Sequence, residues 1–99
     1  MSYHEDLAPD ETELVGEWLE TANRIVGDAT EARIAWLISD RLTEIAIGEG
    51  GWRILYRDLR DGRLWELSYP LGSMHGGGPR RLRLLVRAEA RAKYGAASV

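Results

Sequence analysis

The 99-residue chain contains no cysteine, and this absence excludes several kinds of structure and chemistry. Disulfides cannot form, which agrees with a reducing compartment, and a cysteine nucleophile is excluded as well. No apolar run approaches the roughly 18 residues of a membrane span. The acidic residues 1–10 lack the apolar core of a signal peptide. These absences predict a cytoplasmic protein that is neither exported nor inserted in a membrane.

Histidine is scarce, with only His4 and His75 in the chain. A metal site would need His75 together with Glu66 or Asp58, at no spacing typical of metal ligands. The same groups could perform acid–base catalysis, although no serine-hydrolase or paired-carboxylate motif supports it. We expect no metal, no cofactor and no catalytic residue. A small hydrolase or isomerase that depends on His75 stays open as an alternative.

The length predicts a single domain, 1–99, with residues 1–10 as a loose lead-in. The net charge of −3 hides an uneven distribution. Residues 1–49 carry 12 acidic and 3 basic side chains, whereas residues 50–99 carry 4 acidic and 10 basic ones. Such a division can mark an interaction surface, or the two halves can neutralise each other across the fold.

The first half of the chain predicts two short strands and one long helix. Alternation favours strands within 13–27 and a turn at 21–24, with a helix over 11–26 as the rival interpretation. Asp28 and Glu31 fit a capping box, and the helix is expected to run to Ile47. Its apolar stripe consists of Ile34, Leu37, Ile38, Leu42 and Ile45.

Two residues of this helix do not fit the stripe. Trp36 falls on the opposite side, where it is either a hot spot for binding a partner or packed under the N-terminal segment or the C-terminal tail. Arg41 falls inside the stripe, and we expect its stem to pack on the core with the guanidinium at the rim. The other tryptophans are expected in the core: Trp18, Trp52 and Trp65.

A β-hairpin is predicted next, with strands 52–58 and 64–69 joined by Asp61-Gly62 as a two-residue turn. This register pairs Tyr56 with Leu67 on the core side. On the outward side it pairs Arg57 with Glu66 and Leu55 with Ser68.

The last quarter predicts a strand over 81–86 and a closing helix over 88–94. Leu82, Leu84 and Val86 would face the core. The resulting fold is α+β, a small antiparallel sheet in the order ββαβββα with one main helix packed on one face.

The segment from Ser73 to Pro79 contains His75 and three consecutive glycines. Glycine permits positive φ angles, and exposed N–H groups could bind an anion. No Lys-Ser/Thr follows, so the segment is not a Walker loop. It is either a tight connection between strands or a contact surface for a partner.

Four arginines are expected on the open face of the sheet: Arg53, Arg57, Arg81 and Arg83. Glu66 would lie among them. This face could be a solvated network of ion pairs, an RNA-binding surface or a surface that meets an acidic protein patch.

The chain resembles the immunity protein 27 family of bacterial polymorphic toxin systems. The resemblance rests on Gly51-Trp52, Asp61-Gly62-Arg63, Trp65-Glu66-Leu67, Tyr69-Pro70 and His75-Gly76-Gly77-Gly78-Pro79. It extends to Glu13-Leu14-Val15-Gly16-Glu17-Trp18 and Lys93-Tyr94-Gly95, and so spans about residues 11–95. Leu71-Gly72-Ser73-Met74 departs from the more polar stretch expected before the histidine.

The resemblance implies a small cytoplasmic α+β protein that binds and neutralises a cognate toxin domain, and it carries over no catalytic residue. We expect stoichiometric occlusion, with a protein partner and neither nucleic acid nor membrane. A nucleic-acid-binding module that uses the arginine face stays open as a further alternative. The expected contact residues are Trp36, Arg57, Glu66, Met74, His75, Gly76, Gly77, Arg81 and Arg83.

The acidic half could also meet a basic substrate groove of the toxin and speed association. Its carboxylates are Glu5, Asp6, Asp10, Glu11, Glu13, Glu17 and Glu20.

Overall fold

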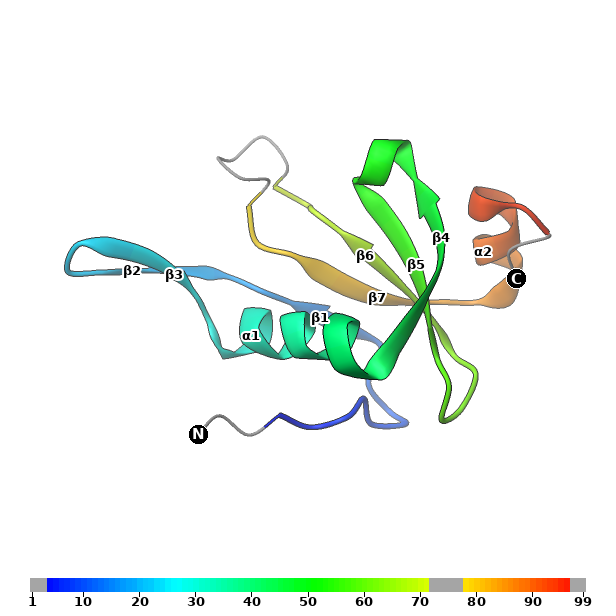
Figure 1. Cartoon of the computed structure of the whole chain (residues 1–99), viewed down its shortest axis with the longest axis horizontal. Helices are drawn as coiled ribbons and strands as arrows, with labels where there is room; N and C mark the ends of the chain where they lie inside the picture. The colour runs from blue at the N-terminus through cyan, green and yellow to red at the C-terminus, as the bar shows by residue number, and fades with distance from the viewer. Residues whose placement is uncertain (1–3, 72–77, 97–99) are drawn as a thin grey trace.

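The computed structural model describes residues 4–71 and 78–96, which form an α+β fold of antiparallel strands and two α-helices (Figure 1). The predicted α+β class is confirmed, whereas the predicted element order ββαβββα is wrong: three strands precede the first helix, and the strand Leu42–Gly48 was not predicted. A five-stranded sheet has the order β1-β7-β6-β5-β4, and β2 and β3 form a separate two-stranded ribbon. The strands are β1 (Glu13–Val15), β2 (Trp18–Thr21), β3 (Arg24–Gly27), β4 (Leu42–Gly48), β5 (Arg53–Asp58), β6 (Leu64–Ser68) and β7 (Arg81–Leu85).

Helices cover both faces of the five-stranded sheet. Helix α1 (Ala29–Trp36) and the π-helical turn η1 (Leu37–Arg41) lie on one face. The core on that face includes Leu7, Leu14, Ile34, Leu37, Tyr56, Trp65, Leu67 and Leu82. Helix α2 (Arg87–Tyr94) packs on the other face over Leu55, Leu64 and Leu85. The face expected to be open is therefore partly closed by the C-terminal helix.

The start of α1 follows the predicted capping box, because the Asp28 carboxylate accepts the Glu31 N–H at 2.8 Å. The predicted end at Ile47 is wrong. After η1 the chain enters β4, so Leu42 and Ile45 belong to a strand and not to a helical stripe. Pairing with β5 outweighs the local helical pattern, and the β-branched residues of β4 suit a strand.

The β5–β6 hairpin forms with a register different from the predicted one. Four residues, 59–62, make the turn, and the Asp58 carboxylate accepts the Arg60 N–H at 3.0 Å. Tyr56 consequently faces Trp65, and Glu66 faces Leu55.

The shift by two residues keeps each side chain on its expected side of the sheet. The predicted pair of Arg57 with Glu66 is nevertheless wrong, since Arg57 faces Leu64. Strand β7 ends at Leu85, so Val86 begins the entry to α2 and is exposed, contrary to its predicted place in the core.

Residues 4–10 are not the loose lead-in that was predicted. Leu7 is only 2% exposed and belongs to the core. Arg33 donates to the carbonyl oxygens of Glu5 and Asp6 at 2.9 Å, and Arg60 donates to that of Leu7 at 2.7 Å. Arginine side chains thus fasten this segment beneath α1 and the β5–β6 turn.

Among the described helices, none has the length and apolar character needed to cross a membrane.

Candidate functional site

The structure brings some of the predicted contact residues together and separates others. Glu66, Arg81 and Arg83 are neighbours on β6 and β7, where Glu66 pairs with Arg83 and Ser68 with Arg81. Arg57 lies farther along β5, beside Leu64. Four predicted residues lie outside the described residues: Met74, His75, Gly76 and Gly77.

Trp36 lies apart from that group. The His4 ring stacks on it with centroids 5.6 Å apart, and the Arg41 guanidinium lies 5.7 Å from the ring centroid. Arg41 itself is exposed and binds Asp6, as expected for a guanidinium at the rim. Trp36 therefore packs under the N-terminal segment, which was one of its two interpretations.

Glu66 is the buried centre of an ionic cluster and is only 1% exposed, whereas the cations around it are partly exposed. Arg53 and Lys93 each donate to its Oε1 atom at 3.3 Å, and the Tyr94 hydroxyl donates to Oε2 at 2.7 Å. The closest Arg83 nitrogen is 3.8 Å from Oε1. The cluster fastens α2 to the middle of the sheet.

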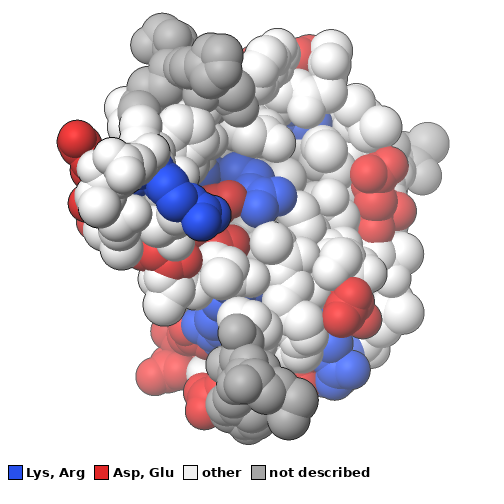
Figure 2. Space-filling view, turned by 60° about the vertical axis from the view of Figure 1, so that its left-hand side comes forward, with Lys and Arg blue, Asp and Glu red and all other residues white. Residues whose placement is uncertain are grey.

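The cations around Glu66 have other carboxylate partners too. Arg83 donates to Glu89 at 2.9 Å, and this hydrogen bond lowers the pKa of Glu89. Arg81 pairs with Glu13, and Arg53 pairs with Glu49 at 3.0 Å. Figure 2 likewise shows basic and acidic side chains interspersed on the face that it presents. These contacts fit the solvated network of ion pairs better than an RNA-binding surface.

Tyr94 and Glu66 form a hydrogen-bonded pair, in which the hydroxyl donates to the carboxylate. Burial, followed by the hydrogen bond to the Glu66 carboxylate, raises the pKa of the Tyr94 hydroxyl. Tyr94 therefore remains a neutral donor over the physiological pH range, which suits a structural contact.

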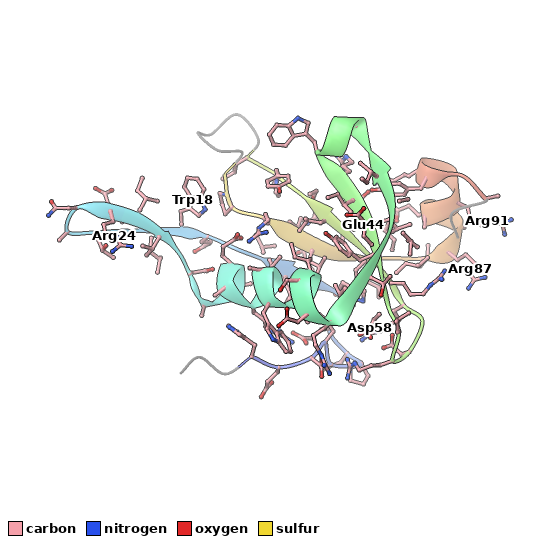
Figure 3. All side chains as sticks on the ribbon, in the orientation of Figure 1. Trp18, Arg24, Glu44, Asp58, Arg87 and Arg91 are labelled. Carbon is pink, nitrogen blue, oxygen red and sulfur yellow. The ribbon has the colours of Figure 1, made fainter. Side chains whose placement is uncertain are left out.

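The carboxylates proposed to assist His75 are both engaged by cations. Glu66 belongs to the ionic cluster just described. Asp58, the last residue of β5, is 2% exposed and binds Arg60 (Figure 3). In the described ranges, no group of three or more histidine or carboxylate side chains could hold a metal ion. The chemistry of this region is charge pairing and hydrogen bonding.

A surface aromatic pair, the exposed Trp52 and the half-buried Tyr69, was missed by the sequence reasoning. Trp52 was expected in the core, but it is 52% exposed and meets Tyr69 edge to face, with ring centroids 5.3 Å apart. Both rings line a hollow of about 270 Å³. The remaining lining residues are Glu49, Arg53, Ser68, Pro70 and Arg81.

The glycines before Trp52 explain its position. Gly50 and Gly51 have φ angles of +65° and +99°, and they turn the chain through the 3₁₀ turn η2 (Glu49–Gly51). Trp52 thus follows a turn at the end of the sheet, where no helix covers it. The Gly48–Gly51 glycines were the available signal that Trp52 precedes the strand.

Two isoleucines pair across β4 and β5. Ile47 on β4 faces Ile54 on β5, on the side of the sheet to which Tyr69 also belongs. Ile47 is 60% exposed and Ile54 is half-buried. We call Trp52 and Tyr69, with Arg53 and Arg81 in the same hollow, the Trp52 surface. Ile47 and Ile54 lie on the α1 side of the sheet and are not part of it.

Neither the curated proteins nor the solved structures contain a match to this chain. The family model described as Immunity protein 27 matches residues 20–86, about two thirds of the chain. The match covers α1, β4, the β5–β6 hairpin and β7, and so includes the Trp52 surface and Glu66. The chain belongs to the immunity protein 27 family.

Proposed function

We propose that this protein binds the cognate toxin domain of a polymorphic toxin system and neutralises it by stoichiometric occlusion, without catalysis of its own, in the cytoplasm. The observation that carries this proposal is the Trp52 surface. Trp52 and Tyr69 stand half out of the sheet at the rim of a hollow that Arg53 and Arg81 also line. Tryptophan, tyrosine and arginine are the residues enriched at binding hot spots.

Ion pairs hold the two arginines of this surface. Arg53 reaches both Glu49 and the buried Glu66, so its guanidinium is held in place by two carboxylates. Arg81 is held by Glu13. A surface whose side chains are already ordered loses less conformational entropy on binding, which favours tight association.

The other predicted contact residues have supporting or peripheral roles in this proposal. Glu66 binds Arg53, which lines the hollow, and Arg83 lies beside Glu66. Met74, His75, Gly76 and Gly77 follow Pro70 in the sequence, and Pro70 also lines the hollow. Trp36 and Arg57 are proposed as peripheral contacts.

Electrostatic attraction would rest on only part of the acidic half. Asp6, Glu11 and Glu13 are in ion pairs with arginines. No ion pair joins the other four carboxylates of the set to a described residue; they are Glu5, Asp10, Glu17 and Glu20. These four are the proposed source of a faster association rate with a basic groove.

The test measures binding and inhibition of the toxin domain encoded beside this gene, purified as an inactive variant for binding. We expect Trp52→Ala and Tyr69→Ala each to weaken affinity by about 30-fold, as for hot-spot residues. The matched controls are Leu59→Ala and Val86→Ala, which remove exposed apolar side chains elsewhere and should leave affinity unchanged. Equimolar wild-type protein should abolish the activity of the toxin.

Two results would count against the proposal in different ways. If the wild-type protein neither binds nor inhibits this toxin domain, the immunity function is wrong. If binding is tight but the Trp52 and Tyr69 variants bind as the controls do, the function stands and the Trp52 surface is the wrong contact.

A further inference from the structure

The β2–β3 ribbon projects from the body as an arm, which we define as Trp18–Gly27 (Figure 1). Its two strands pair only with each other and belong to no larger sheet. A two-stranded ribbon without a hydrophobic support is marginally stable in water. The presence of an isolated ribbon at this place in the fold therefore requires an explanation.

The arm carries apolar side chains on both of its faces. The strand register places Leu19 and Val26 on one face, and Trp18 and Ile25 on the other. Leu19 is 47% exposed and Ile25 is 63% exposed. The Trp18 side chain points away from α1 in Figure 3. Neither face is fully covered by the body of the protein.

The base of the arm, in contrast, is held firmly by Glu31 in the first turn of α1. A Cβ atom at Gly27 would lie 2.6 Å from Cγ of Glu31, and one at Gly16 would lie 2.6 Å from its Oε2 atom. The Glu31 carboxylate also accepts the Arg80 backbone N–H at 3.0 Å and its Nε at 2.6 Å. The chain that enters the arm at Gly16 and the chain that leaves it at Gly27 are thus both packed against the Glu31 side chain.

Two backbone hydrogen bonds complete this attachment. The Gly16 N–H donates to the Arg80 carbonyl at 2.8 Å, and the Asp28 N–H donates to that of Glu17 at 2.8 Å. The arm is consequently preset in direction while its apolar side chains stay open to solvent. This combination is typical of a preorganised contact element and not of a connection between two core strands.

We propose that the arm is a second contact with the toxin domain and inserts into a cleft of that domain with apolar walls and a basic mouth. The two-sided apolar character is the reason for a cleft, because a flat partner or a stacked second copy would cover only one face. Glu17, just before the arm, and Glu20 on β2 are exposed and would meet the mouth of the cleft, which is the reason for a basic mouth; Arg24 at the tip would enter the cleft beyond it. This inference rests on the proposed function and adds the shape and chemistry of the partner's site.

Figure 2 is turned toward this side of the molecule, and it shows the surface hollowed beside the protruding part, with basic and acidic side chains around the hollow. A partner that encloses the arm would meet this surface at the same time. The arm and its surroundings therefore form a contact region of their own.

The decisive variant is Leu19→Ser/Ile25→Ser, which removes one exposed apolar side chain from each face. We expect its affinity for the inactive toxin domain to fall by about 10- to 100-fold, as for two hot-spot side chains. Leu59→Ser/Val86→Ser removes two comparably exposed side chains elsewhere and should bind like the wild type. Circular dichroism of both variants checks that the fold is retained.

Hydrogen exchange of the wild-type protein provides a measurement that needs no variant. Amides within 18–21 and 24–27 should exchange quickly in the free protein and slow at least 10-fold in the complex, since a cleft excludes water from the arm.

The outcomes separate the two proposals. If the wild-type complex forms and Trp52→Ala weakens it, but the arm variant binds normally and arm exchange is unchanged, the arm inference is wrong and the proposed function stands. If the wild-type protein does not bind the toxin domain, both are wrong. If the free protein forms a dimer in sedimentation that only the arm variant disrupts, with toxin affinity unchanged, the arm binds a second copy and the inference is overturned.

Discussion

Glu66 shows how a single side chain fixes the arrangement of a sheet and a helix. It lies on the α2 side of β6, opposite Leu55 on one neighbour and Arg83 on the other. A carboxylate that is 1% exposed is stable there only because Arg53, Lys93 and Tyr94 all donate to it. Two of these donors belong to α2, so the helix is bound to the sheet through one acceptor group.

Replacing Glu66 by alanine should therefore lower the free energy of unfolding by about 2–3 kcal/mol, because the partly exposed Arg53 and Lys93 lose their shared counter-charge and the Tyr94 hydroxyl loses its acceptor. Glu66→Gln keeps the shape and should lose about 2 kcal/mol. Tyr94→Phe, which deletes only the hydroxyl, should lose about 1 kcal/mol. Urea denaturation measures all three.

Glu89→Gln is the matched control for Glu66, since it removes a carboxylate that pairs with the same Arg83 and Lys93 at the surface. Its effect should be much smaller than that of Glu66→Gln. Equal losses for the two variants would mean that burial of Glu66 does not matter to stability.

At the scale of elements, the first turn of α1 directs the β2–β3 ribbon. Glu31 occupies the third position after the Asp28 cap, where its backbone N–H is bound by the cap and its side chain is free to reach Gly16, Gly27 and Arg80. A helix start and a ribbon are thus specified by the same short segment. The two glycines are required here for close approach.

Gly27→Ala should lower the free energy of unfolding by about 1–2 kcal/mol, because the new methyl group overlaps Glu31. The same substitution in a Glu31→Ala background should cost clearly less, since the Cγ atom at 2.6 Å is gone and only the Cβ atom of residue 31 remains, at 3.0 Å. Chemical denaturation of the four proteins of this double-mutant cycle gives the coupling free energy. Additive effects would show that Glu31 does not hold the arm at Gly27.

At the scale of the whole molecule, the acidic and basic halves of the chain neutralise each other in part. Arg80 with Glu31, Arg81 with Glu13 and Arg60 with Asp6 are ion pairs between the two halves. Other pairs join residues within the acidic half. Arg33 of α1 with Glu11 is one of them, and it attaches the N-terminal segment to the helix. Many charged side chains of both halves are therefore engaged in ion pairs within the folded chain.

Acid should weaken the attachment of the N-terminal segment through the Arg33–Glu11 pair in a defined pH range. The hydrogen bonds from Arg33 lower the pKa of Glu11 from 4.5 to about 2, so the pair stabilises the fold fully above pH 4.5 and is lost as the pH falls toward 2. Compared with Glu11→Gln, the wild type should be more stable at pH 7 by about 1–2 kcal/mol, allowing for solvent screening.

The difference should shrink below pH 4.5 and vanish near pH 2. Thermal or urea unfolding at pH 7, 4 and 2.5 measures it, with Glu20→Gln in the exposed arm as the control. A difference that does not change with pH would show that the Glu11 charge is not what stabilises the segment.

Local signals in the sequence were sufficient for part of this fold. The Asp28 cap, the turn at 21–24 and the stop of α2 before Gly95 depend on neighbouring residues, and all three are found. Long-range pairing decided the rest. Leu42 and Ile45 fit a helical stripe as well as a strand, and only the partner strand β5 selects between them.

The candidate site was predictable to a similar extent. The grouping of Glu66 with Arg81 and Arg83 followed from strand alternation, which survived the two-residue error in register. The burial of Glu66 did not follow, because it depends on α2 folding back over the sheet. Trp52 was misplaced since composition says only that tryptophan prefers the interior, whereas the preceding glycine turn carries it past the cover of α1.

The firm attachment of the arm at Glu31 has a consequence for how such a protein can change its partner. The residues at which the arm is held, Gly16, Gly27 and Glu31, are distinct from those whose side chains it exposes, Leu19 and Ile25. If the arm contacts the partner as proposed, substitutions at its exposed positions would change the preferred partner while the residues that attach it to α1 stay the same.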